Sequence, residues 1–335
     1  MPWASGMSVT QLRAPKEDWT VSQILETIQP HCRSELDELR VVALCPPAKV
    51  NVSGAKEVAS VHFSQSFFAA TAQRQHAALV NTLEQHRVRV VDLREALLAD
   101  ERAVSDQMAN RVFVRDPACT IGLRLVVGAA GLPARDPDFH FARLSLQREI
   151  PADCITSEPN AGAIEFGDVL LLRSDAALIN VGWRTTRVGV ESLRPVLASQ
   201  GVTEVGLVSL PRWPDIPHLD VAANVLSQDS MVACSFLRHI LVEVSDLQRP
   251  NTYMTLTDFV HRHGYTIHWL PDDVDPLPNI NFLHLDPDTV MQSSRGHHVF
   301  EWVQEARMRA VQVDVSELEK GGGGVRCVTM PLVRQ

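Results

Sequence analysis

The sequence lacks long apolar runs and clusters of basic residues. No apolar run approaches the roughly 18 residues needed to cross a bilayer, and residues 1–23 are polar, without the apolar stretch of a signal peptide. The net charge is −9, with 31 Lys and Arg against 40 Asp and Glu, and no basic patch forms. We therefore expect a cytoplasmic protein, with neither nucleic acid nor a membrane surface as partner.

Cysteine pairs and metal-binding spacings are also missing. The six cysteines are scattered and none lies in a C-x-x-C pair, which predicts reduced thiols and no zinc site. Thirteen histidines are many, but His261/His263 and His297/His298 have no companion ligands at known spacings. Solvated surface histidines are the better interpretation, so no metal and no other cofactor is expected.

A pattern of apolar β-rich runs with an intervening amphipathic helix recurs at intervals of about 50–60 residues, which indicates a repeat. The expected helices are His76–Gln85, Val188–Leu197, Leu256–His263 and His298–Ala306, and the expected strands are Val41–Leu44, Val88–Val91, Val112–Val114, Leu123–Val127, Val169–Leu172, Ala177–Val181, Val205–Ser209, Val221–Leu226, Met231–Cys234, Thr266–Leu270, Phe282–Leu285, Val290–Gln292 and Ala310–Val313.

Each of the roughly five units is too small to bury its own sheet. Units arranged around an axis would share one closed core, whereas the alternative is an ordinary open α/β sheet, and the pattern leaves both possible. No linker rich in Gly, Ser or Pro divides the chain. We expect residues 1–38 to be a lead-in, with a short helix at Val21–Ile28, and residues 39–335 to form a single catalytic domain.

The segment Gly321-Gly322-Gly323-Gly324-Val325-Arg326-Cys327 is the most informative one for function. Four glycines allow positive φ or a close approach of the backbone to a ligand. Arg326 beside Cys327 would favour the thiolate, which is the nucleophilic form of cysteine. The alternative is a flexible tail with an incidental cysteine.

Three further segments place acids or histidine beside apolar runs. Asp116 follows an expected strand, Glu165 and Asp168 precede one, and in a strand His218 and Asp220 would share a face. Each has a structural alternative as a turn residue or a satisfied core residue. Together with Cys327 they supply a thiol nucleophile, an acid/base imidazole and carboxylates that would suit a planar cation such as a guanidinium.

These segments resemble the arginine deiminase and amidinotransferase superfamily. The resemblance rests, in family order and over most of the chain, on Phe113-Val114-Arg115-Asp116-Pro117 (F-x-R-D-P), Glu165-Phe166-Gly167-Asp168 (E-G-G-D), His218-Leu219-Asp220 (H-L-D) and Gly323-Gly324-Val325-Arg326-Cys327-Val328-Thr329-Met330-Pro331-Leu332 (G-G-x-R-C-x-[ST]-M-P-L). It implies a five-bladed α/β propeller (pentein) of ββαβ repeats, with arginine deiminase as the most similar branch.

The resemblance also implies roles for single residues. Cys327 would attack the guanidinium carbon, His218 would act as general acid and base, and Glu165 would orient His218. Asp116 and Asp220 would grip the guanidinium nitrogens. The remaining implied substrate contacts are Asp168, Asn110, Phe113, Arg184 and Arg143, with Asn110 and Arg184 reading a substrate carboxylate.

The chain departs from the family pattern at three places. Phe166 replaces a glycine, Gly322 stands where arginine deiminases carry an arginine, and the segment between Leu97 and Asn110 is too short for their helical insertion. We expect a hydrolase that converts arginine or a substituted arginine to citrulline and ammonia or an amine, and the sequence leaves a homo-oligomer open. The alternatives are an amidinotransferase, disfavoured because those enzymes tend to carry His where Arg326 stands, and a non-catalytic binding protein.

Overall fold

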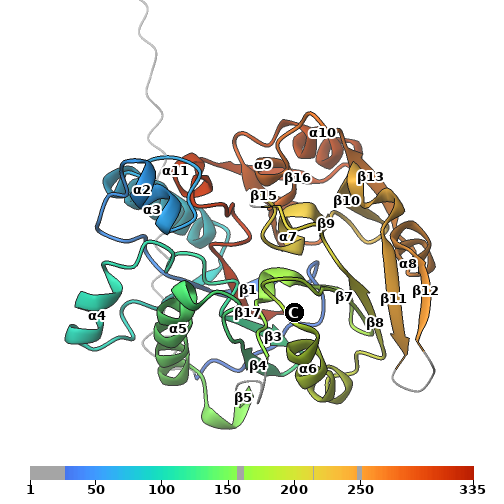
Figure 1. The fold of residues 1–335 in the computed structure, drawn as a ribbon, viewed down its shortest axis with the longest axis horizontal. Coiled ribbons are helices and arrows are strands. Elements are labelled where there is room, and N and C mark those ends of the chain that lie inside the picture. Colours follow the sequence, from blue (N-terminus) through green and yellow to red (C-terminus); the bar gives the residue numbers. More distant parts are fainter. Residues whose placement is uncertain (1–26, 157–161, 214, 247–250) are drawn as a thin grey trace, which may run out of the picture.

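The computed structural model describes residues 27–156, 162–213, 215–246 and 251–335. Within these ranges, no helix is long and apolar enough to cross a membrane. The strands form five small sheets, four with three strands and one with five. The sheets are arranged around a common centre, and helices α3, α5, α6, α8 and α10 lie towards the outside (Figure 1).

One sheet illustrates the order that all five share. Strand β6 (Val169–Arg173) pairs antiparallel with β7 (Ala176–Asn180), helix α6 (Arg187–Ser199) crosses over, and β8 (Glu204–Val208) pairs parallel with β7. These strands are continuous apolar runs because both faces of the sheet are covered. The hydroxyl of Thr186 caps the start of α6 by accepting a hydrogen bond from Gly189 N.

Three other sheets repeat the same ββαβ order. Their elements are β3 (Ala118–Ile121), β4 (Arg124–Val127), α5 (Asp136–Glu149) and β5 (Ile155–Thr156); β9 (Ala223–Val225), β10 (Ser230–Cys234), α8 (Leu256–Arg262) and β13 (Thr266–Leu270); and β14 (Leu283–Asp286), β15 (Thr289–Ser293), α10 (His297–Glu305) and β16 (Arg309–Val313).

The C-terminal strand closes the ring. Strand β17 (Met330–Arg334) pairs antiparallel with β1 (Leu39–Leu44), and α3 (Ala69–Gln85) leads from β1 to its parallel partner β2 (Arg89–Asp92). The first unit therefore takes its missing strand from the far end of the chain, and β1 and β17 lie side by side in Figure 1. The expected five-bladed α/β propeller is confirmed.

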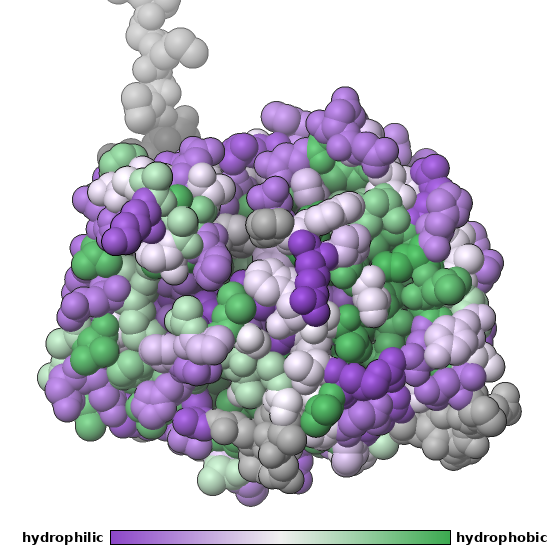
Figure 2. All heavy atoms as spheres, in the orientation of Figure 1, coloured by the Kyte–Doolittle hydropathy of each residue, from purple (hydrophilic) through white to green (hydrophobic). Residues whose placement is uncertain are grey.

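Short elements and one hairpin complete the fold. The hairpin of β11 (Leu241–Asp246) and β12 (Thr252–Thr255) widens the β6–β8 sheet to five strands. Apolar residues gather over β10 and β11 on the face drawn in Figure 2. The short helices are α2 (Ala55–Ser60), α4 (Ala99–Ser105), α7 (Leu219–Ala222), α9 (Pro276–Ile280) and α11 (Ser316–Glu319), and the 3-10 turns are Pro133–Arg135, Ala152–Cys154, Phe166–Asp168 and Ser235–His239.

The structure corrects the sequence prediction at several elements. The expected strand Val112–Val114 is a turn, in which Phe113 N donates to Asn110 O. The expected strand Val221–Leu226 is instead the end of α7 followed by β9. Helix α5 was missed because its sequence has few apolar residues at helical spacing.

Residues near the start of the described chain pack against the propeller. Cys32 and Gly122 exchange backbone hydrogen bonds of 2.9 and 2.6 Å, and His31 bridges to Val333 of β17. Glu35 is buried. The expected helix Val21–Ile28 lies almost entirely outside the described residues, and its last two residues are not helical.

Candidate active site

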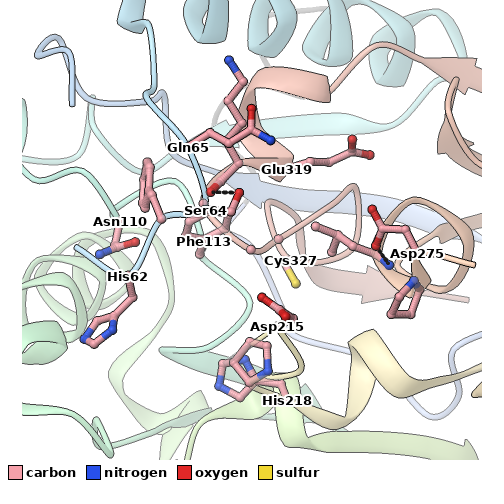
Figure 3. A pocket seen from close by; sticks show the side chains of 18 of the residues that line it. His62, Ser64, Gln65, Asn110, Phe113, Asp215, His218, Asp275, Glu319 and Cys327 are labelled. Carbon is pink, nitrogen blue, oxygen red and sulfur yellow. Dashed lines mark hydrogen bonds between the residues drawn. The ribbon is translucent and has the colours of Figure 1, made fainter. Parts of the chain in front are cut away.

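A cavity of about 760 Å³ opens among the loops that connect the blades (Figure 3). This volume is within the usual range for small-molecule sites. Loops from several blades line it, so residues far apart in sequence meet there. The lining segments fall mainly within 59–65, 110–116, 183–184, 215–218, 272–277 and 319–327.

The glycine run shapes the wall that carries Cys327. A Cβ on Gly321 or on Gly323 would lie 2.6 Å from a ring atom of Phe113, so both positions require glycine for the ring to pack there. Gly322 has φ +85°, which favours glycine on conformational grounds. Phe113 therefore supports the loop that presents Cys327, and both residues line the cavity (Figure 3).

His218 stands between two carboxylates. It occupies the N-cap position of α7, and its Nε2 lies 2.8 Å from Glu165 Oε2 while its Nδ1 lies 3.6 Å from Asp116 Oδ1. Gly167 makes this approach possible, because a Cβ there would lie 2.8 Å from both His218 Cγ and Asp116 Oδ1. Burial alone would lower the pKa of His218, but Asp116 and the hydrogen bond to Glu165 outweigh it and raise the pKa to about 9.

Asp116 and Asp220 each keep one oxygen without a hydrogen bond, although Asp116 Oδ1 lies 3.6 Å from Nδ1 of His218. Asp116 Oδ2 accepts from Arg135 at 3.1 Å, and Asp220 Oδ2 accepts from Arg326 at 2.7 Å. The Oδ1 atom of each carboxylate is buried and makes no hydrogen bond. An unsatisfied buried carboxylate oxygen is costly, so both atoms mark positions where a ligand donor could bind.

The thiol of Cys327 lies close to charged groups of both signs. Its Sγ lies 3.5 Å from Asp220 Oδ2, and burial, Asp220 and Asp116 raise its pKa well above the ordinary value. Arg326 acts in the opposite direction but is already paired with Asp220 and with Glu35, at 2.7 and 2.8 Å. Arg326 alone therefore does not offset burial and the two carboxylates, and its role in ionising the thiol stays a prediction.

The strand expected at His218–Asp220 is wrong, but the two residues still flank Cys327. His218 caps α7, and Asp220 lies within its first turn. Asp168 supports this arrangement, because its Oδ1 accepts from Leu219 N at 3.1 Å and from Asn180 Nδ2 at 2.9 Å. Burial raises the pKa of Asp168 to about 6.

Of the residues that the sequence predicted to contact the substrate, Asn110 and Arg184 line the cavity, whereas Arg143 does not. Asn110 lines the cavity and donates to Val61 O at 3.3 Å. Arg184 also lines it, stacks on Trp183 and donates to Glu165 Oε2 at 3.0 Å, but its buried Nε has no partner. Arg143 lies on α5, where its Nη2 is 3.3 Å from Nδ1 of His140, and it does not line the cavity.

Three site residues were missed by the sequence analysis. Arg135 bridges Asp116 and Asp138, Asn281 contacts the sulfur of Cys327, and Glu35 binds Arg326. None lies in a recognisable motif. The buried ion pairs of Arg135 and Arg326 fix Asp116 and Asp220, because each occupies the Oδ2 oxygen of its carboxylate and leaves Oδ1 without a hydrogen bond.

Two departures from the family pattern have structural consequences. Phe166 is fully buried in the core with Ile164 and Val169, so its ring does not line the cavity. Gly322 leaves open space, because nothing lies within 4 Å of a Cβ built there. Lys320 does not fill this gap, since it pairs with Glu317 at 2.9 Å.

One trio in the described part of the chain has the geometry of potential metal ligands: Asp116, Glu165 and His218, whose ligand atoms lie within 4.8 Å of one another. Arg135 and Arg184 already form ion pairs with the two carboxylates, and His218 shares a hydrogen bond with Glu165. This charge balance fits an acid–base pair better than a cation site. The absence of a metal remains a prediction.

Glu165→Gln is expected to lower the pKa of His218 by about one to two units, because a charge-assisted hydrogen bond contributes roughly 1.5–3 kcal/mol and one unit equals about 1.4 kcal/mol. The direction follows because the Glu165 anion favours the imidazolium. NMR titration of the His218 ring checks this, with a wild-type midpoint near the pKa of about 9. Glu204→Gln, which breaks the surface pair with His263, is the control. An unchanged midpoint in Glu165→Gln contradicts the assignment.

Because the pKa of His218 is raised, its interactions with Asp116 and Glu165 stabilise the folded protein only over a defined pH range. The folded-state pKa of about 9 lies above the ordinary value of 6.5. The contribution is therefore fully present below pH 6.5 and is lost as the pH rises through about 9.

Comparison with known proteins gives a consistent family and fold. A family model described as arginine deiminase matches residues 95–257 and 278–334. The uncharacterized protein YkgA of Bacillus subtilis (strain 168) is 25% identical over 311 residues, which cover 90% of this chain and 95% of YkgA. The arginine deiminase of Listeria monocytogenes serotype 4b (strain CLIP80459) is 26% identical over 258 residues, which cover 69% of this chain but 62% of the relative's length.

A solved structure supports the fold independently. A cysteine-to-serine mutant of DDAH from Pseudomonas aeruginosa, complexed with citrulline, superposes with a TM-score of 0.65 at 18% identity. The match covers 88% of this chain and 99% of that one. At this identity the likeness concerns the fold.

Proposed function

The chain belongs to the arginine deiminase family, and we propose that it hydrolyses the guanidino group of arginine or a substituted arginine through a covalent intermediate on Cys327. The observation that carries the proposal is the convergence on one buried site of the Cys327 thiol, His218 and one oxygen each of Asp116 and Asp220 that makes no hydrogen bond. A guanidinium offers donors that match two carboxylates and places its carbon between them.

Substrate binding prepares the first step. The guanidinium donates to Asp116 Oδ1 and Asp220 Oδ1, and its positive charge offsets the two anions that raise the pKa of Cys327. The thiol then loses its proton to solvent, and the thiolate Sγ attacks the guanidinium carbon. His218 donates its proton to the departing nitrogen as the C–N bond breaks, which leaves an amidino group on sulfur.

Hydrolysis completes the cycle. The amine leaves, and neutral His218 removes a proton from a water that attacks the same carbon. The tetrahedral intermediate collapses to a C=O group as its hydroxyl proton passes to solvent, the C–S bond breaks and the electron pair returns to sulfur as thiolate. The product is a ureido compound, citrulline in the case of arginine. Glu165, bonded to His218 at 2.8 Å, keeps the imidazole oriented through both half-reactions.

The carboxylate and the ammonium group of an amino-acid substrate would be bound by residues of opposite charge. Arg184 offers a buried Nε without a hydrogen-bond partner, Asn110 also lines the cavity, and these groups would hold the carboxylate. Acidic residues at the mouth would attract the ammonium group. These exposed residues, which have no Lys or Arg ion-pair partner within the described ranges, are Asp215, Asp272, Asp273 and Asp275.

Arginine is therefore expected to exceed agmatine, which lacks the carboxylate, by roughly 30- to 5,000-fold in kcat/KM, because losing a buried charge-assisted contact costs about 2–5 kcal/mol. Arg184→Gln should reduce this ratio towards one, whatever it does to the absolute rate through Glu165. Arg295→Gln is the matched control, since Arg295 lines the same cavity but pairs with Glu319. Equal turnover of both substrates by the wild-type protein contradicts the role of Arg184.

Product analysis in ¹⁸O-labelled water tests the reaction type. Hydrolysis incorporates one labelled oxygen into the ureido product of arginine and releases ammonia, and an added acceptor amine changes nothing. An unlabelled amidino group on the acceptor, with ornithine as the other product, would identify an amidinotransferase instead. If neither product forms from arginine or from its N-substituted derivatives, the result favours the non-catalytic binding protein.

A further inference from the structure

A buried asparagine contacts the reacting sulfur and was not part of any motif. Asn281 directly follows α9 and is only 2% exposed. Its Nδ2 donates to Cys327 Sγ at 3.0 Å and to Asp220 O at 3.1 Å. Its Oδ1 accepts from Cys327 N at 3.0 Å and from Gly324 N at 3.1 Å. One side chain thus joins the nucleophile, its loop and the segment that carries Asp220.

The orientation of this amide is determined by its surroundings. The backbone N–H groups of Cys327 and Gly324 are donors and can only be met by the amide oxygen. The amino group must then face the other way, towards the sulfur and the carbonyl of Asp220. Both of its hydrogens have acceptors there, so all four contacts of the side chain are satisfied.

The sulfur needs such a donor. Its other close polar contact is Asp220 Oδ2 at 3.5 Å, and Asp116 adds a second negative charge nearby. Arg326 is the opposing cation, but it is shared between Asp220 and Glu35. A charge that develops on a buried sulfur therefore depends on Asn281 for a direct hydrogen bond.

We propose that Asn281 is a catalytic residue that stabilises the Cys327 thiolate by donating its Nδ2–H to Sγ. The role rests on the proposed function, because the thiolate forms before attack on the guanidinium and again when the C–S bond breaks. Nδ2 also holds the carbonyl of Asp220, so the donor to sulfur and the carboxylate next to it keep a fixed relative position.

Three variants separate this role from simple anchoring of the loop. Asn281→Ala removes both the donor and the acceptor. Asn281→Asp keeps an oxygen for the N–H groups of Cys327 and Gly324, which favour its ionised form, but it replaces the donor to sulfur with an anion. Asn279→Ala is the matched control, because Asn279 is a buried asparagine in α9, the helix that Asn281 follows, and its side chain contacts Asp275 O and His298 N.

The first readout is the rate of Cys327 alkylation by iodoacetamide between pH 7 and 9.5, followed by mass spectrometry of the peptide that contains Cys327. Asn281→Ala is expected to react roughly 10- to 150-fold more slowly at a given pH, the equivalent of one hydrogen bond to a charged group. Asn281→Asp is expected to react at least as slowly, and Asn279→Ala as fast as the wild type. This readout needs no substrate, so it stands even if the proposed reaction is wrong.

The second readout is steady-state turnover. Asn281→Ala and Asn281→Asp should lower kcat by a similar factor with little change in KM, because the donor acts on charge that appears during reaction. A purely structural role predicts the opposite order, with Asp rescuing what Ala loses. The proposal is overturned if Asn281→Asp alkylates and turns over within about twofold of the wild type. Should Asn281→Ala fail to fold, the Asp variant still decides the question.

Discussion

Cys327→Ser is expected to leave essentially no turnover, a loss on the order of 10⁴- to 10⁶-fold, while the protein remains folded. Serine is nearly isosteric, so its hydroxyl can keep the contact with Asn281 and the loop can keep its shape. A hydroxyl beside the Asp220 and Asp116 anions does not ionise enough to attack a resonance-stabilised carbon. Steady-state assays with arginine, alongside a thermal melt, provide the measurement.

Cys154→Ser is the control for this variant. Cys154 is only partly buried and lies in the 3-10 turn that precedes β5, away from the cavity lining. Its replacement should leave turnover unchanged. If Cys327→Ser retains more than about one hundredth of the activity with an unaltered melting temperature, the covalent route is excluded in favour of direct attack by water.

His218→Ala is expected to lower turnover by roughly 10²- to 10⁴-fold, because it removes the acid of the first half-reaction and the base of the second. The first half-reaction needs a proton only when the leaving group is an amine. An S-alkyl isothiourea analogue, whose thiolate leaves without protonation, should therefore still modify Cys327 in the variant, and the adduct should persist because no base activates water. Stopped assays with mass spectrometry measure both effects.

His263→Ala serves as the matched control, since His263 pairs with Glu204 and neither residue lines the cavity. It should retain the wild-type rate with arginine and accumulate no adduct from the isothiourea. If His218→Ala turns over arginine at the wild-type rate, or clears the adduct as fast as the wild type does, His218 is neither the acid nor the base.

Much of the fold was predictable because each blade repeats the same local pattern. Strands such as β6 and β7 are covered on both faces and therefore appear as apolar runs in the sequence. The prediction failed where burial does not follow a regular period. Val112 and Val114 are buried in a turn that packs under the glycine loop, and α5 buries too few apolar residues to show a helical period.

The position of the candidate site was predictable from motifs, but the hydrogen bonds and ion pairs that hold its residues in place were not. Cys327, His218 and Asp116 line one cavity, and the order of their segments along the chain indicated as much. The partners that fix them come from contacts across blades. Glu35 and Asn281 reach Arg326 and Cys327 over separations of 291 and 46 residues, and no local spacing records such contacts.

The direction of side chains was also beyond the sequence. Phe166 points into the core between sheet and helix rather than towards the substrate, because Gly128 leaves room for its ring. Arg184 lies in the cavity wall as expected but also binds Glu165, which links the predicted carboxylate contact to the acid–base pair. Both features depend on packing that only the folded chain defines.

Acid quenching during turnover, followed by peptide mass spectrometry, tests the covalent mechanism most directly. The account predicts that the peptide containing Cys327 gains the mass of the amidino group with the attached substrate chain, that the adduct forms within the first turnover, and that it is absent from Cys327→Ser. Turnover of arginine with no adduct on Cys327 at any time, or with an adduct on another cysteine, would contradict it.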